Sequence, residues 1–148
     1  MNNKKTQFND ILPLIEESFS RGESVVFSPS GQSMLPMFRA GRDKVELCPF
    51  KGKVKKYDVV FFRRADGNFV LHRVIEAGES YIIIGDNRIY HDKVAPEQII
   101  GVVASFERNG KKYTQRKIRS KPYIAFISAR RLLRRVSAKI KRILNGGI

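Results

Sequence analysis

The residues of this chain that could do chemistry together are one serine, one histidine and two aspartates. Ser33 lies in the segment GQSMLP at 31–36, His72 lies in the apolar run LHRVI at 71–75, and Asp86 and Asp92 follow the next apolar run. A serine hydroxyl needs a base within hydrogen-bond reach, and an imidazole with a pKa near ~6.5 can be that base. A carboxylate then fixes the imidazole tautomer. Such a site predicts activity that rises through a pKa of about 6 to 7.

Each of these residues also has an ordinary structural explanation. A serine in a Gly/Pro turn usually bonds nearby backbone, and Asp86 in GDN at 85–87 equally suits a tight turn. His72 fits a histidine that is simply packed in a strand. His91 lies in a polar segment beside Asp92 and is interpreted as a surface residue.

The order of five short motifs resembles the signal peptidase I family of serine peptidases. They are GxSMxP around Ser33, GRD at 41–43, YDVVF at 57–61, HRV at 72–74, and GDN at 85–87 with Asp92 after it. The resemblance spans about residues 24–107. In that family the base is a lysine in most bacterial enzymes and a histidine in the endoplasmic-reticulum and archaeal type. This chain resembles the histidine branch.

The resemblance implies a serine endopeptidase that cleaves an extended precursor or leader peptide after small residues. Ser33 is then the nucleophile and His72 the general base, while Asp92 orients the imidazole and Asp86 braces its loop. No metal or cofactor is implied. Two other readings remain open, a catalytically silent relative that binds extended peptides and a regulator resembling the self-cleaving repressors. The intact set of Ser33, His72 and the aspartates argues against the first, and the absence of room for a DNA-binding domain before the strands argues against the second.

The oxyanion formed on attack needs fixed donors, of which the Ser33 N–H is the first. In lysine-type relatives a hydroxyl side chain two residues earlier can help. Here that position is Gly31, so another donor is needed. Met34 is expected to line the substrate groove, with core packing as an equal alternative.

Composition and patterning predict one mainly β domain with a helix at each end. The chain has 148 residues, of which 42% are hydrophobic, and a single cysteine, so no internal disulfide can form. Apolar residues at helical spacing predict a short helix within 1–22 that packs on the domain, and Asp10 can cap it. β-branched and aromatic runs separated by Gly, Pro, Asp and Asn predict a signal-peptidase-like coiled antiparallel sheet over 23–116. The runs are 25–27, 45–47, 59–62, 69–75, 81–84, 99–106 and 112–115.

The segment 117–148 is expected to form a basic amphipathic helix. Residues 108–148 carry 14 Lys/Arg and no Asp/Glu, whereas residues 1–107 are nearly neutral. Apolar residues at helical spacing form one face; they are Leu132, Leu133, Val136, Ile140, Ile143 and Leu144. Charges interrupt every apolar run well short of the ~20 residues that span a bilayer.

This helix has three possible binding surfaces. Residues 120–148 suit an anionic membrane surface, the apolar face could instead pack on the chain's own domain, and nucleic acid is disfavoured because no recognition motif is present. We expect a peripheral membrane protein. The side of the membrane stays open, with the cytoplasm as one alternative, because the sequence shows no signal peptide or transmembrane segment.

Overall fold

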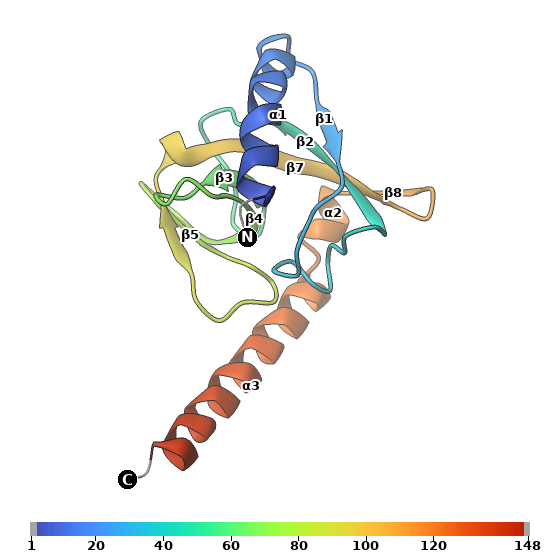
Figure 1. Ribbon diagram of the computed structural model, residues 1–148. Coiled ribbons are helices and arrows are strands. Elements are labelled where there is room, and N and C mark those ends of the chain that lie inside the picture. The colour runs from blue at the N-terminus through green and yellow to red at the C-terminus, as the bar shows by residue number, and fades with distance from the viewer. Residues whose placement is uncertain (1–2, 147–148) are drawn as a thin grey trace.

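The computed structural model describes residues 3–146, which form a bent β-sheet with a helix at each end (Figure 1). The elements are α1 (Asn3–Ser20), β1 (Val25–Phe27), β2 (Asp43–Pro49), β3 (Val59–Arg63), β4 (Phe69–Ala77), β5 (Tyr81–Ile84), β6 (Asp92–Val94), the short 3-10 helix η1 (Pro96–Gln98), β7 (Ile99–Arg108), β8 (Lys111–Thr114), α2 (Gln115–Ile118) and α3 (Lys121–Asn145). The chain is mainly antiparallel β-sheet, as its β-branched and aromatic runs predict.

The sheet is eight-stranded, with the order β1-β2-β7-β3-β4-β5-β6 and with β8 paired to β7. Every pair is antiparallel, and bulges at Glu46/Leu47, Phe61/Phe62 and Val74/Glu76 shift the register. Because a bulge bends a strand and increases its twist, the sheet can coil around its side chains. A turn joins β7 to β8, and its Asn109 and Gly110, which separate the two predicted runs in the sequence, both have positive φ.

The central strand β3 is buried on both faces and joins two hydrophobic clusters. Val59 and Phe61 point into the larger cluster, which α1 covers through Ile15, while Val60 and Phe62 point into the smaller one, under β5 and β6. This alternation is the two-residue period of a strand. The next strand, β4, pairs with the whole of β3 through its residues 69–73 and carries His72.

Helix α1 begins earlier than its apolar pattern predicts. It runs from Asn3 to Ser20, so Asp10 lies inside the helix and not at its cap, and Pro13 is also internal. Ile15 is buried, and Ile11 and Phe19 pack beside it on the larger cluster. Phe8 is another of the apolar residues whose helical spacing predicts this helix, and its side chain lies outside the described residues.

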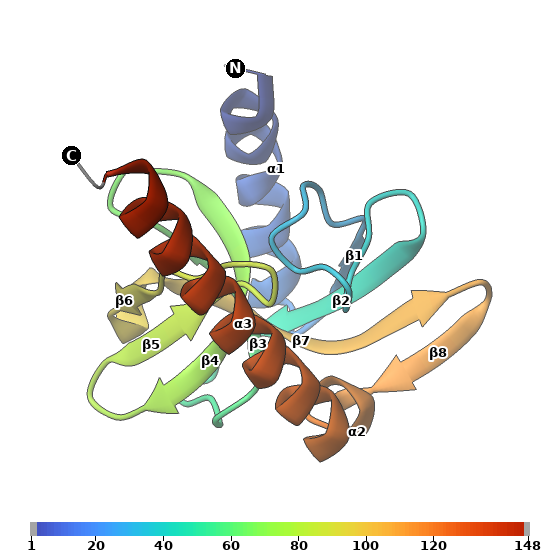
Figure 2. The ribbon, with the colours of Figure 1, turned by 90° about the horizontal axis from the view of Figure 1, so that it is seen from below.

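The predicted C-terminal helix is divided in two. Pro122 lies in the first turn of α3, where the backbone N–H that proline lacks would have no partner within the helix. In the middle of a continuous helix, proline would remove a backbone hydrogen bond. α2 and α3 are therefore separate, and α3 leaves the sheet as a long rod (Figures 1 and 2). None of the helices within residues 3–146 is long and apolar enough to cross a bilayer.

Candidate active site

Ser33 lies in a turn whose apolar side chains anchor it in the core. Gly31 has φ 80°, which favours glycine, and the Leu35–Pro36 peptide is cis. The Leu35 N–H donates to the Gln32 carbonyl at 3.2 Å. Met34 is only 4% exposed and belongs to the larger hydrophobic cluster, so its side chain fills the core beneath the turn. The expectation that Met34 lines a groove is therefore replaced by its alternative, packing.

The loop after β5 holds this turn from the other side. The Asn87 N–H donates to the Ser33 carbonyl at 2.8 Å, and the Asn87 side-chain amide donates to the Gln32 carbonyl at 3.0 Å. Within residues 3–146 the Ser33 N–H makes no hydrogen bond. The turn is thus fixed through its carbonyls, and the Ser33 N–H stays available to a bound oxygen.

The imidazole of His72 faces the serine turn. His72 is 2% exposed, and a methyl group added at Gly85 would lie 2.9 Å from its Nε2 and 2.6 Å from the Ser33 carbonyl oxygen. Both distances are shorter than any ordinary contact of a Cβ. Position 85 must therefore be glycine, because Nε2 and the Ser33 backbone converge on the space where a side chain would start.

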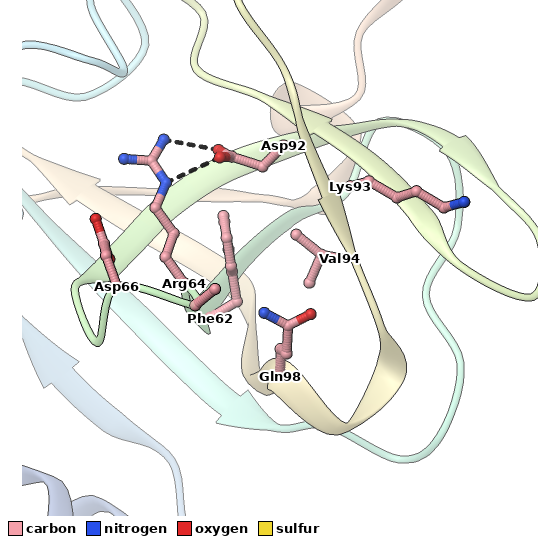
Figure 3. Close-up of a pocket in the computed structure, with 8 residues that line it drawn as sticks. Phe62, Arg64, Asp66, Asp92, Lys93, Val94 and Gln98 are labelled. Carbon is pink, nitrogen blue, oxygen red and sulfur yellow. Dashed lines mark hydrogen bonds and ion pairs between the residues drawn. The ribbon is translucent and has the colours of Figure 1, made fainter.

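The other imidazole nitrogen faces Asp92. Nδ1 of His72 is 3.5 Å from Oδ2 of Asp92, an ion-pair distance at which no hydrogen bond is formed. Asp92 is itself held by Arg64, whose Nε and terminal nitrogen donate to the carboxylate at 3.0 and 2.7 Å (Figure 3). The backbone of Ser33 therefore lies near His72, His72 faces Asp92, and Arg64 holds Asp92, although the four residues come from four separate segments.

The pKa of His72 is lowered to about 4, first by burial and then by the positive charge of Arg64. The negative charge of Asp92 raises this pKa but does not offset the other two effects. Arg88 also lowers this pKa. Because water is excluded and cations lie nearby, the imidazolium is disfavoured. At neutral pH the imidazole is uncharged, which is the form of a base that can accept a proton.

Asp86 belongs to a different network from His72. It is 3% exposed and accepts two hydrogen bonds from Arg73, each at 2.7 Å, and a third from the Tyr123 hydroxyl at 2.8 Å. Arg73 also donates to the carbonyls of Tyr57 and Ile118. Burial and the neighbouring Asp86 raise the pKa of Tyr123, which therefore stays a donor. The network joins β4 and the loop after β5 to α2 and α3.

Arg64 and strand β6 are the parts of this site that the sequence patterns do not reveal. Arg64 follows β3 and reaches Asp92 from 28 positions away. β6 is only three residues long, and the pairing of Asp92 with Ile83 of β5 fixes where the Asp92 carboxylate lies along the sheet. A cavity of about 350 Å³ lies on the side of Asp92 and Arg64, lined also by Phe62 and Val94 (Figure 3).

The comparisons with known proteins add no identification. No protein-family model matches the chain, and no curated protein matches it either.

Proposed function

We propose that this protein is a serine endopeptidase of the signal peptidase I type, with Ser33 as nucleophile, His72 as general base and Asp92 as the residue that orients it. The observation that carries the proposal is the convergence at Gly85. Nε2 of His72 and the Ser33 backbone meet there, while Nδ1 of the same ring faces a carboxylate. The proposal sets the Ser33 hydroxyl against Nε2, because a base between a hydroxyl and a carboxylate is the arrangement that activates a serine.

The proposed reaction uses these groups in turn. His72 Nε2 takes the proton of the Ser33 hydroxyl as its oxygen attacks the peptide carbonyl, and the Ser33 N–H donates to the oxyanion that forms. The proton passes from the imidazole to the leaving amine, and a water then releases the acyl group by the same route. The 3.5 Å contact between His72 and Asp92 shortens to a hydrogen bond as the imidazolium forms. The proposed fold is the coiled sheet of the same family, and Asp86 has a bracing role within it.

The test is cleavage of an extended-peptide library by the purified protein, read by mass spectrometry. Wild type should cut after small residues, and Ser33→Ala and His72→Ala should each remove nearly all cleavage. The double variant should lose little more, because the two residues act as a unit. Ser30→Ala is the matched control, since Ser30 lies in the same exposed segment, three residues before the nucleophile. Equal cleavage by wild type and Ser33→Ala would end this proposal.

The second candidate is a peptide-binding relative without turnover. Two observations favour it. Neither His72 nitrogen has a hydrogen-bond partner within residues 3–146, and burial lowers the pKa of the imidazole and makes it a weak base. The same library distinguishes the two functions. A silent relative retains peptides in a pull-down without cutting them, and Ser33→Ala retains them equally well.

A further inference from the structure

Helix α3 contacts the domain through a face rich in arginine. Ile124 and Ile127 are buried, and further along the same face Arg131 donates to the carbonyl of Arg88 at 3.3 Å. Arg134 donates to both the carbonyl and the side-chain oxygen of Asn87, at 2.8 and 2.5 Å. These contact residues are spaced three and four apart, which is the spacing of one helical face. The two guanidinium groups thus donate hydrogen bonds to backbone carbonyls of the loop after β5, which is the loop that holds the serine turn.

The apolar stripe lies on the opposite face of α3. At 3.6 residues per turn, its centre is roughly 180° around the helix from the face that contacts the domain. The six side chains of the stripe are between 49% and 76% exposed; they are Leu132, Leu133, Val136, Ile140, Ile143 and Leu144. The alternative that this stripe packs on the chain's own domain is therefore wrong. In Figure 1 the second half of α3 stands clear of the sheet.

Charge decides what can cover such a stripe. Residues 121–145 contain eight Lys/Arg and no Asp/Glu, and no carboxylate side chain follows Glu107 anywhere in the sequence. On a helical projection, Lys139 flanks the stripe on one side and Lys141 flanks it on the other. Arg130 lies on the same side as Lys141, where it also donates to the Leu35 carbonyl at 3.5 Å. Such a helix, apolar on one face and cationic along both edges, has the form of helices that lie in a membrane interface.

A second copy of the chain is the main competitor. Phe126, Leu133, Val136, Ile140 and Ile143 also follow the three-and-four spacing of a coiled-coil seam. Pairing two such helices would place cations against cations along both edges, with no acid to offset them. An anionic bilayer instead supplies both an apolar layer for the stripe and negative headgroups for its edges.

We propose that the outward face of α3 binds the surface of an anionic lipid bilayer, with the stripe Leu132 to Leu144 at the level of the acyl-chain boundary and the flanking lysines among the headgroups. The helix lies in the plane of the surface, and its arginine face stays on the domain. This binding does not depend on the serine chemistry, so it can fail while cleavage succeeds, and the reverse.

The experiment is co-sedimentation of the full-length protein with vesicles of phosphatidylcholine, with or without phosphatidylserine. We expect binding only where phosphatidylserine is present, and weaker binding as salt rises because exposed charges are screened. The double variant Leu133→Ser with Ile140→Ser should reduce partitioning onto the vesicles at least ~tenfold, because it removes two apolar side chains whose transfer out of water favours binding. Leu14→Ser with Val26→Ser is the matched control, because these side chains are 62% and 60% exposed and lie far from the stripe in the sequence. The control should bind like wild type.

Circular dichroism checks that both double variants remain folded. A third variant, Lys139→Gln with Lys141→Gln, should weaken binding by up to about thirtyfold at low salt. The proposal is overturned if wild type ignores phosphatidylserine vesicles, or if the stripe variant binds them as well as wild type. It is also overturned if the protein self-associates through the stripe without binding lipid, or binds nucleic acid with a steep salt dependence and ignores vesicles.

Discussion

Replacing Arg64 by methionine should raise the pKa of His72, and this can be measured without a substrate. The pKa of His72 is lowered from 6.5 to about 4, a change that corresponds to about 3 kcal/mol against the imidazolium. Burial is the largest cause and stays in the variant, but Arg64 is the next. Methionine keeps much of the side-chain volume and removes the cation. It also leaves the charge of Asp92 uncompensated, which favours the imidazolium further. We expect a rise of about one unit.

The assay is NMR titration of the imidazole carbon-bound protons, with His91→Gln used to assign the two histidine signals. Asp92→Asn should move the His72 titration in the opposite direction, because it removes the group that opposes the shift. The reasoning is refuted if His72 titrates between pH 6 and 7 in the wild-type protein, as the sequence alone predicts, or if Arg64→Met lowers its pKa.

Three further predictions follow from the packing of the site. Asp86→Asn should lower the free energy of unfolding by about 3 kcal/mol or more, and the melting temperature with it, because the buried Arg73 loses its counter-charge. Asp92→Asn should instead reduce turnover with little change in melting temperature. The opposite pattern would mean that the two aspartates have exchanged roles. Gly85→Ala should cost about 1–3 kcal/mol and abolish cleavage, since the added methyl meets the imidazole and the serine turn, and normal turnover in this variant would contradict the geometry. Deleting 120–148 should unfold the protein, because it removes Tyr123 and two buried isoleucines, whereas deleting 138–148 should leave melting and peptide cleavage intact and remove only vesicle binding.

Folding stability should also depend on pH through His72. The folded pKa is about 4 and the unfolded value is 6.5, so between these values the unfolded chain binds the proton and the folded protein does not. Stability contributed by this group is therefore full above about pH 6.5 and declines as the pH falls toward 4. Denaturant titrations of wild type and His72→Gln at pH 7 and pH 4.5 measure it. The variant should lose less stability on acidification, and an equal loss in both proteins would contradict the assignment.

All strands except β6 were predictable, because each of them contains a run of β-branched or aromatic residues bounded by turn residues. Ser33, His72 and Asp92 could be named from their residue types and order. Arg64 could not be named in this way, because its role depends on a contact with Asp92, 28 positions away, and a local sequence pattern carries no information about such a contact. β6 has three residues, of which only Val94 is apolar, so its strand character comes from pairing with β5 and not from its own sequence.

The C-terminal helix shows a different limit of sequence patterns. Its apolar stripe is the strongest periodic signal in that part of the chain, and yet α3 docks by another face. The docking depends on guanidinium groups that reach loop carbonyls, and a hydrophobic pattern cannot distinguish such arginines from solvated ones. The single helix predicted over 117–148 also missed the break before Pro122, which lies in the first turn of α3, where proline is accepted.

Asn87 is bonded on both sides: it accepts from Arg134 of α3 and donates to the carbonyls of Gln32 and Ser33. One short relay of hydrogen bonds thus connects a helix whose other face is open to solvent with the backbone of the candidate nucleophile. Thermodynamic linkage makes any coupling through this relay reciprocal. If lipid binding at α3 changes the affinity of the serine turn for a peptide, then a bound peptide must change the affinity of α3 for lipid by the same factor. Arg134→Gln should uncouple the two affinities, which peptide titrations with and without vesicles would measure.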